Sequence, residues 1–123
     1  MAETTGGAVI ERGAHLGPSM DVQWQHYVDA EEPDERGYHR YYYAYRLYAF
    51  SHAGAVLCAR RYDDTADTVS LLGWGANGEQ SRLSERDLVH PLVKKAVHWL
   101  RADGATQVHW LDRNSGTYRT IES

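Results

Sequence analysis

The sequence has a single cysteine, Cys58, so no disulfide can form within the chain. The pattern of cysteines typical of a small secreted domain is therefore absent. No apolar run approaches the ~18 residues that a membrane-spanning helix requires. Residues 1–20 contain neither a basic segment nor a continuous apolar segment of the kind found in signal peptides. These absences predict a cytoplasmic protein that contacts no membrane.

Aliphatic residues are also scarce, because Leu, Ile, Val and Phe together make up only 22 of 123 residues. Such a low share warns of disorder when it is combined with a high net charge. Here the formal net charge is only −4, and nine tyrosines and four tryptophans can bury large areas. We therefore expect a folded domain whose core depends on Tyr and Trp.

Known catalytic and cofactor motifs are missing as well. The run GWGANG (73–78) fits a dinucleotide-binding pattern, but no helix opens at its third glycine and Trp74 would crowd a pyrophosphate. The seven histidines show no metal-ligand spacing, and Cys58 has no C-x-x-C partner. His109, Asp112 and Ser115 are close in sequence, which says nothing about a triad. We expect no catalytic residue, no metal and no cofactor; a small-ligand or enzyme pocket near His109 is the third-ranked alternative.

Most of the remaining chain has the pattern of β-strands. Residues 1–20 contain four glycines and no period, so we expect a flexible tail followed by one domain over 21–123. An acidic loop spans 29–35. Strands separated by turn residues are predicted at 21–28, 38–50, 55–62 and 68–74, and a C-terminal hairpin at 106–121.

One amphipathic helix is predicted between the last two groups of strands. Ser84 and Asp87 can form a capping box, and Gly104 is a typical C-terminal stop. Pro91 conflicts with a continuous helix, so either the helix kinks there or its regular part begins at Pro91 with His90 as a poor cap. The predicted fold class is thus α+β: an antiparallel β-meander of three to four strands, one helix packed on one sheet face, and a C-terminal β-hairpin.

The segment Tyr38–Phe50 is chemically unusual because it holds six of the nine tyrosines. Residues 36–62 contain five arginines and no acidic residue, within a chain that is acidic overall. If the segment is a strand, its residues alternate between two faces. The face with Arg46 is the more polar, so we expect Tyr41, Tyr43, Tyr45 and Leu47 to face the helix. The opposite face would then expose a binding surface made of Tyr42, Arg46, Tyr48, Arg60 and Tyr62.

Tyrosine and arginine are enriched where protein interfaces concentrate their binding energy. The leading hypothesis is therefore a non-enzymatic protein-interaction module: an inhibitor, an antitoxin-type or immunity-type protein, or an adaptor, with self-association as a further option. Single-stranded nucleic acid on the same face is the alternative, since bases stack on aromatic rings while arginines hold phosphates. The acidic balance of the chain makes nucleic acid the less favoured of the two. The simplest interpretation of this face is a stiff strand whose tyrosines need no partner.

Overall fold

The fold is described from a computed structural model, which describes residues 8–30, 35–36, 42–75 and 81–121. The elements follow one another along the chain as strands, with short 3-10 helices and one α-helix in the C-terminal half. Their bounds are β1 Ala8–Leu16, β2 Asp21–Ala30, β3 Tyr42–His52, β4 Ala55–Tyr62, η1 Asp63–Thr65, β5 Thr68–Trp74, η2 Glu85–Val89, α1 Pro91–Ala102, β6 Gln107–Leu111 and β7 Tyr118–Ile121.

The seven strands form one sheet in the order of the sequence, from β1 at one edge to β7 at the other. All neighbouring strands are antiparallel except β5 and β6, which pair in parallel. A parallel pair needs a crossover connection, and α1 lies in the segment that joins β5 to β6. The α+β class and the C-terminal hairpin are confirmed. The meander of three to four strands was an undercount, and the assumption of a purely antiparallel sheet is wrong at β5–β6.

Strand β1 lies in the segment that we expected to be a flexible tail. It pairs with β2 from Ala8 to Leu16, so the boundary expected at residue 20 does not separate a tail from the sheet. Gly13, one of the glycines behind that expectation, is required by packing. A Cβ at Gly13 would lie 2.0 Å from Cζ2 of Trp24, because the indole ring covers this position. The glycine therefore permits strand packing here, although glycine is usually depleted in strands.

The helical region divides into η2 and α1, as the alternative with an α-helix starting at Pro91 predicted. The Ser84 and Asp87 capping box is confirmed, with Ser84 N donating to Asp87 Oδ2 at 2.7 Å, but it caps η2. The ring of His90 caps α1, since its Nδ1 accepts from Leu92 N at 3.1 Å. Pro91 at the first helical position loses no helical hydrogen bond, because that N–H would be unpaired in any case.

The helix covers the sheet face opposite to the one that we expected. Tyr48 is 1% exposed and Phe50 is fully buried, and both rings contact Trp99 of α1, with centroids 5.9 Å and 5.8 Å away. Tyr43, which we placed toward the helix, is 52% exposed. The expected face assignment is therefore inverted for Tyr43, Tyr45 and Leu47, and Tyr41 lies outside the described residues.

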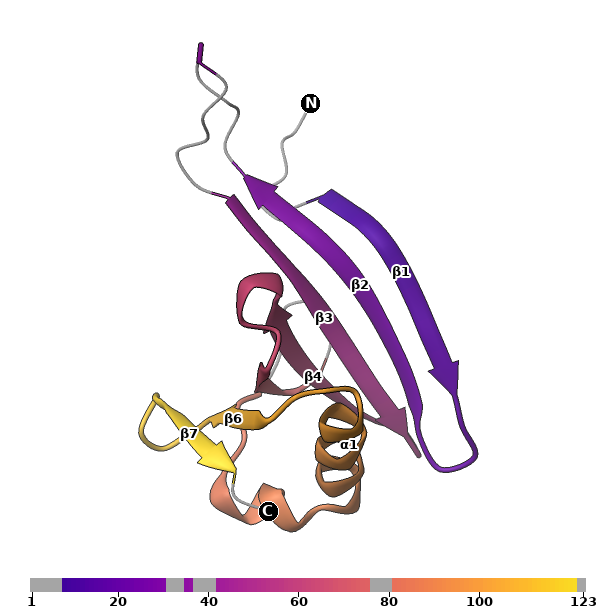
Figure 1. The fold of residues 1–123 in the computed structure, drawn as a ribbon. Coiled ribbons are helices and arrows are strands. Elements are labelled where there is room, and N and C mark those ends of the chain that lie inside the picture. Colours follow the sequence, from indigo (N-terminus) through magenta and orange to yellow (C-terminus); the bar gives the residue numbers. More distant parts are fainter. Residues whose placement is uncertain (1–7, 31–34, 37–41, 76–80, 122–123) are drawn as a thin grey trace.

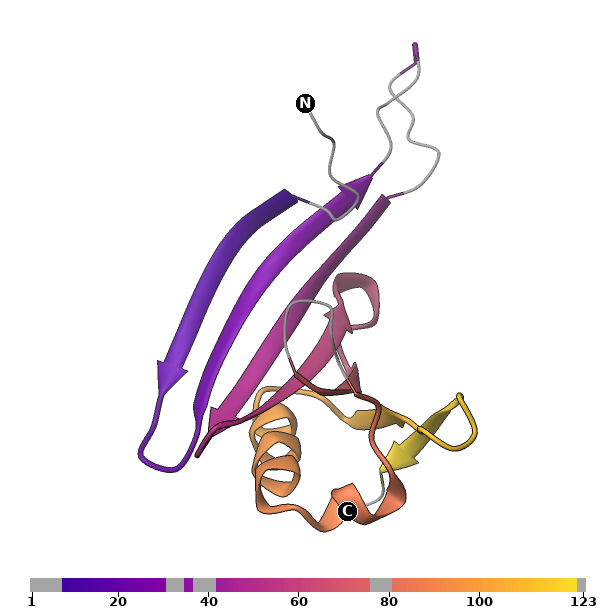
Figure 2. The same cartoon turned by 180° about the vertical axis from the view of Figure 1, so that it is seen from behind.

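Arg46, the polar residue on which the face assignment of β3 was based, lies in a part of the sheet that α1 does not cover. Figures 1 and 2 show β1, β2 and β3 extending well beyond the compact end of the molecule, which contains α1, η2, β6 and β7. We call this extension the arm; it consists of residues 8–12, 25–30 and 42–47. Arg46 lies in the arm, on the same face as Tyr48 but beyond the cover of α1, so its charge remains half-exposed. None of the helices in the described part of the chain is long and apolar enough to cross a membrane.

Candidate functional site

A cluster of tyrosines covers the sheet face that α1 leaves open, which we call the open face. Tyr27, Tyr45 and Tyr62 are direct cross-strand neighbours on β2, β3 and β4. The rings of Tyr27 and Tyr45 stack at 5.4 Å, and the ring of Tyr62 meets that of Tyr45 edge-on at 5.6 Å. Tyr43 extends the group, 6.3 Å from Tyr62. We call these four residues the tyrosine cluster. Aromatic pairs of this kind contribute about 0.5–1.5 kcal/mol beyond the area that they bury.

Arg60 joins the tyrosine cluster to the far edge of the sheet. Its guanidinium carbon lies 5.2 Å from the centre of the Tyr62 ring, and its Nη2 donates to the hydroxyl of Tyr118 on β7 at 3.1 Å. The Nε atom is buried and has no hydrogen-bond partner within the described part of the chain. Tyr118 is 47% exposed, so this arrangement holds a cation among phenol rings at the protein surface.

Two of the five predicted site residues lie together on the open face, namely Arg60 and Tyr62. Arg46 lies on the other face, and Tyr48 belongs to the core. Tyr42 begins β3, but its side chain lies outside the described residues. A shift of one residue along a strand moves every side chain to the other face. Such a shift explains why Arg46 and Tyr48 lie on the opposite face from Arg60 and Tyr62.

The sequence interpretation missed Tyr27, Tyr43, Tyr45 and Tyr118 as members of this surface. Tyr27 lies two residues after Gln25 in β2, and this spacing already indicated that the two side chains share a face. Tyr118 is brought near Arg60 only because β5, β6 and β7 are added beside β4. No pattern within the segment 38–62 contains that information.

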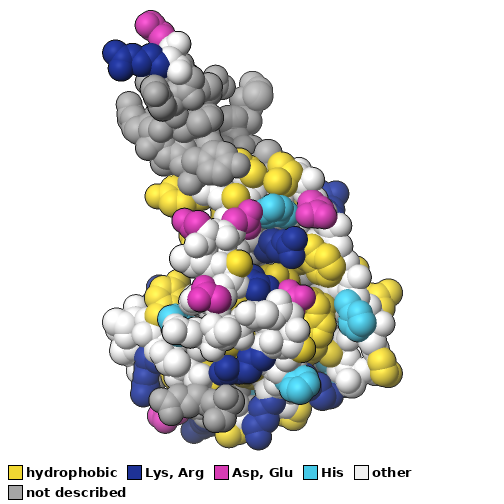
Figure 3. Space-filling model, in the orientation of Figure 1, with side chains coloured by type: hydrophobic (Ala, Val, Ile, Leu, Met, Phe, Trp, Pro, Cys, Tyr) yellow, Lys and Arg dark blue, Asp and Glu magenta, His cyan; other side chains and the backbone are white. Residues whose placement is uncertain are grey.

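The α1-side face of the arm carries a separate cleft of about 300 Å³ lined by charged groups. His26 Nε2 lies 2.7 Å from Asp63 Oδ2, and Glu11 lies 3.8 Å from both His26 and Arg46. Figure 3 shows basic, acidic and histidine side chains gathered where the arm leaves the compact end. Each basic side chain in this group has an acidic neighbour, so the network is typical of a structural role.

Arg61 forms the inner wall of the same cleft and is 9% exposed. It donates to Asp103 Oδ2 at 2.9 Å, to the carbonyl of Ala66, and to the hydroxyl of Tyr48 at 3.4 Å. Burial alone would lower the pKa of Arg61, but its contacts with Tyr48 and Asp103 raise that pKa overall. The guanidinium therefore remains charged and ties β4 to the end of α1.

His109 lies on β6, and Asp112 and Ser115 follow it in the segment before β7. Ser115 Oγ is bonded to Thr117 Oγ1 at 2.8 Å and its side chain also hydrogen-bonds to Asp112, while no hydrogen bond between described residues links His109 to either Asp112 or Ser115. Within the described ranges there is also no group of three His, Cys, Asp or Glu side chains that could hold a metal ion.

Asp112 instead fixes the loop between β6 and β7. It is 4% exposed, and its carboxylate accepts from Asn114 N at 2.9 Å and from Arg119 Nη1 at 3.2 Å. The backbone N–H of Asn114 is the main cause of a pKa below the usual range for Asp112; burial opposes this shift, and Arg119 adds to it. The ionised carboxylate is thus the form that stabilises this loop.

We expect Asp112→Asn to lower the free energy of unfolding at neutral pH and to flatten its loss in acid. Because the folded-state pKa is depressed, the stabilisation is present above the unfolded pKa of about 3.9 and is lost as pH falls through the lower folded value. Urea denaturation from neutral pH down to about pH 2 measures this dependence. The exposed acid Asp64, changed to Asn, is the control. An acid dependence equal to that of the unmodified protein would contradict the prediction.

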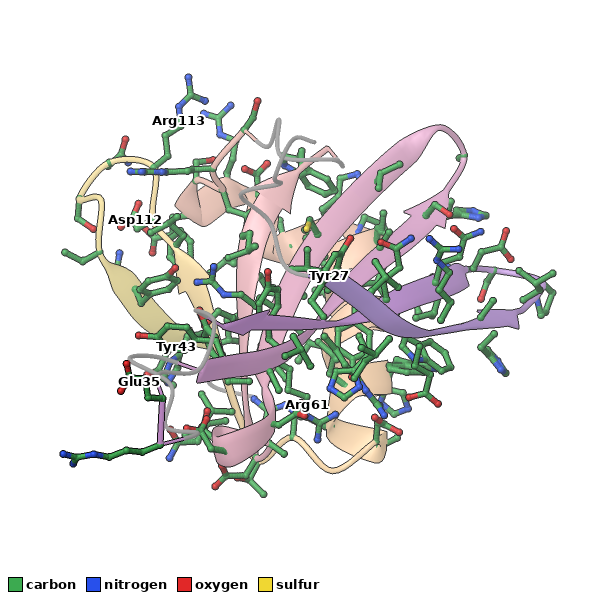
Figure 4. The ribbon with its side chains drawn as sticks, turned by 90° about the horizontal axis from the view of Figure 1, so that it is seen from above. Tyr27, Glu35, Tyr43, Arg61, Asp112 and Arg113 are labelled. Atoms are coloured by element: carbon green, nitrogen blue, oxygen red, sulfur yellow. The ribbon has the colours of Figure 1, made fainter. Side chains whose placement is uncertain are left out.

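Figure 4 shows how these features are distributed around the molecule. Arg61 lies on one side, while Asp112 and Arg113 lie together at a separate place, with the Arg113 side chain extending away from the ribbon. The cleft beside Arg61 and the loop that carries Asp112 therefore lie at different places on the molecule. Comparison with known proteins adds no relative to this description, since no family model, no curated protein and no solved structure matches the chain.

Proposed function

We propose that the protein is a non-enzymatic interaction module that binds a protein partner through the open face. The observation that carries this proposal is the tyrosine cluster with Arg60 on a sheet face that α1 does not cover. Tyrosine buries a large area with few rotatable bonds and keeps a hydroxyl for hydrogen bonding, and arginine combines charge with a flat apolar surface. The candidate roles are an inhibitor, an antitoxin-type or immunity-type protein, or an adaptor in the cytoplasm.

The chemistry of the open face favours a partner that offers carboxylates and other hydrogen-bond acceptors. Arg60 is a cation that makes no ion pair with a carboxylate within the described residues, and the phenol hydroxyl of Tyr118 lies on an exposed side chain beside it. A carboxylate from a partner could pair with the guanidinium while apolar groups cover the rings. Surrounding contacts that exclude water would strengthen such a pair.

Single-stranded nucleic acid is less well supported on this face. Of the arginines behind that alternative, Arg46 and Arg61 lie on the other face of the sheet beside Glu11 and Asp103. The rings of Tyr27 and Tyr45 already stack on each other, which leaves less aromatic surface for bases. Nucleic acid is therefore an outcome that the experiment must detect, and so is self-association through the same face.

We expect the double variant Arg60→Ala with Tyr62→Ala to lose partner binding by about tenfold or more, as residues at interface hot spots do. The test begins with light scattering to establish the oligomeric state. A pull-down from nuclease-treated lysate follows, and the affinity for the purified partner is then measured with unmodified and variant protein. Circular dichroism and urea denaturation verify that the variant is folded.

The matched control is Lys94→Gln with Val89→Ser, which changes one charged and one exposed apolar residue away from the open face. The proposal requires that this control binds normally. A partner bound equally well by Arg60→Ala with Tyr62→Ala would refute the assignment of the open face. Binding that disappears after nuclease treatment would favour nucleic acid instead.

A further inference from the structure

A second cleft, of about 870 Å³, lies at the compact end of the molecule, away from the arm. Its lining includes three arginines from three different segments: Arg82 follows β5, Arg86 belongs to η2, and Arg113 follows β6. Trp74, at the end of β5, adds an aromatic wall. Its volume falls within the roughly 300–1,000 Å³ that is usual for small-molecule sites.

Backbone hydrogen bonds hold the segments that carry these arginines. Ser81 pairs with Trp74 through two hydrogen bonds, of 2.8 Å and 2.7 Å, so the chain leading to Arg82 is fixed against β5. Arg113 N donates to the carbonyl of Leu83 at 2.7 Å, which fixes the loop after β6 beside the same segment. The backbone segments from which Arg82 and Arg113 extend are therefore held in place by hydrogen bonds.

The three arginines of this cleft have exposed side chains. None of the three guanidinium groups forms an ion pair with a described carboxylate. Arg82 extends toward the β6–β7 loop, since its Nη1 would lie 3.6 Å from a Cβ built on Gly116. Three like charges lining one cleft repel each other, and a bound anion would remove that cost.

Two carboxylates also line the cleft, and their positions restrict the ligand. Asp87 is occupied because its Oδ2 accepts from both Ser84 N and Ser84 Oγ. Burial alone would raise the pKa of Asp87, but the hydrogen bonds from Ser84 and Trp74 lower it overall, so this group stays ionised. Glu85 is exposed. With three cations against two anions, the formal charge of the lining is positive, so the cleft favours an anion that contacts the arginines and avoids the two carboxylates.

We propose that this cleft binds a small polyphosphate-type anion, such as pyrophosphate or the diphosphate group of a nucleotide. Guanidinium groups form paired hydrogen bonds with phosphate oxygens, which gives arginine sites their geometric selectivity. Side chains supply the recognition here, so the site differs from the backbone-lined loop that the GWGANG run suggested. Trp74 is partly exposed and lines the same cleft, so we expect its fluorescence to change when an anion binds. The site is independent of the open face.

The test is calorimetric titration of the full chain with pyrophosphate at low salt, repeated with Arg86→Gln combined with Arg113→Gln. We expect saturable binding, a Kd that rises about tenfold or more in this variant, and affinity that falls with added salt. The matched control is Arg12→Gln combined with Lys94→Gln, which removes the same charge from exposed positions outside the cleft. This control should bind like the unmodified protein.

Each remaining outcome overturns the proposal. Absence of binding removes the site, and an equal loss of affinity in both double variants reduces it to non-specific attraction by net charge. A third titration uses a short single-stranded oligonucleotide. If the oligonucleotide binds through Arg86 and Arg113 while pyrophosphate does not bind, the cleft serves nucleic acid and the assignment to a small anion is wrong.

Discussion

Tyr48→Ala is expected to lower the free energy of unfolding by about 4 kcal/mol, the loss typical of removing a large buried aromatic side chain. The ring is 1% exposed and lies between Trp24, Phe50 and Trp99, with centroids 6.5, 5.9 and 5.9 Å away. Its removal leaves a cavity where β2, β3 and α1 meet. Urea denaturation followed by tryptophan fluorescence measures the change.

Two companion variants separate the parts of this effect. Tyr48→Phe keeps the ring and removes only a hydroxyl whose bond to Arg61 is long, at 3.4 Å, so we expect a loss of about 1 kcal/mol. Tyr62→Ala truncates a half-exposed ring and should cost about 1 kcal/mol through its aromatic contacts. If Tyr48→Ala preserved stability and abolished partner binding, Tyr48 would belong to a surface, as its position in the sequence first suggested.

The sequence was sufficient to predict elements whose determinants are local. The capping box at Ser84, the proline at the start of α1 and the turn between β3 and β4 all depend on residues a few positions apart. Strand β1 was not predictable in this way. Its glycine at position 13 weakens the strand pattern, and the reason for that glycine is the ring of Trp24 on the neighbouring strand. The parallel pairing of β5 with β6 likewise depends on where α1 returns the chain.

The candidate site shows the same division between local and non-local information. Arg60 and Tyr62 lie two residues apart on one strand, so their shared face followed from the period of a β-strand. Which face α1 covers could not be read from that period. Tyr48 and Arg46 lie on the same face of β3. The ring of Tyr48 is buried and the charge of Arg46 is half-exposed, because α1 covers only one end of the strand. A single polar residue is therefore a poor guide to the face of a strand that extends beyond its cover.

Gly73→Ala is expected to destabilise the fold by about 3 kcal/mol or more, through backbone strain and overpacking together. Gly73 has a φ of +147°, a backbone conformation that residues other than glycine rarely adopt. A Cβ at this position would lie 2.2 Å from the carbonyl oxygen of Ser81 and 2.8 Å from its carbonyl carbon. Backbone atoms cannot rotate away as a side chain can, so the Ser81 segment would have to separate from β5.

The control for this prediction is Gly54→Ala in the turn between β3 and β4. Gly54 also has a positive φ, +85°, but no atom lies within 4 Å of a Cβ built there. Gly54→Ala therefore reports strain alone and should cost about 1 kcal/mol. The excess in Gly73→Ala measures the close approach of Ser81, and the same displacement should weaken pyrophosphate binding, because Arg82 directly follows Ser81. Urea denaturation measures both losses. Equal losses in the two variants would show that Gly73 is required for its φ alone, and not for the close contact with Ser81 that fixes the segment leading to Arg82.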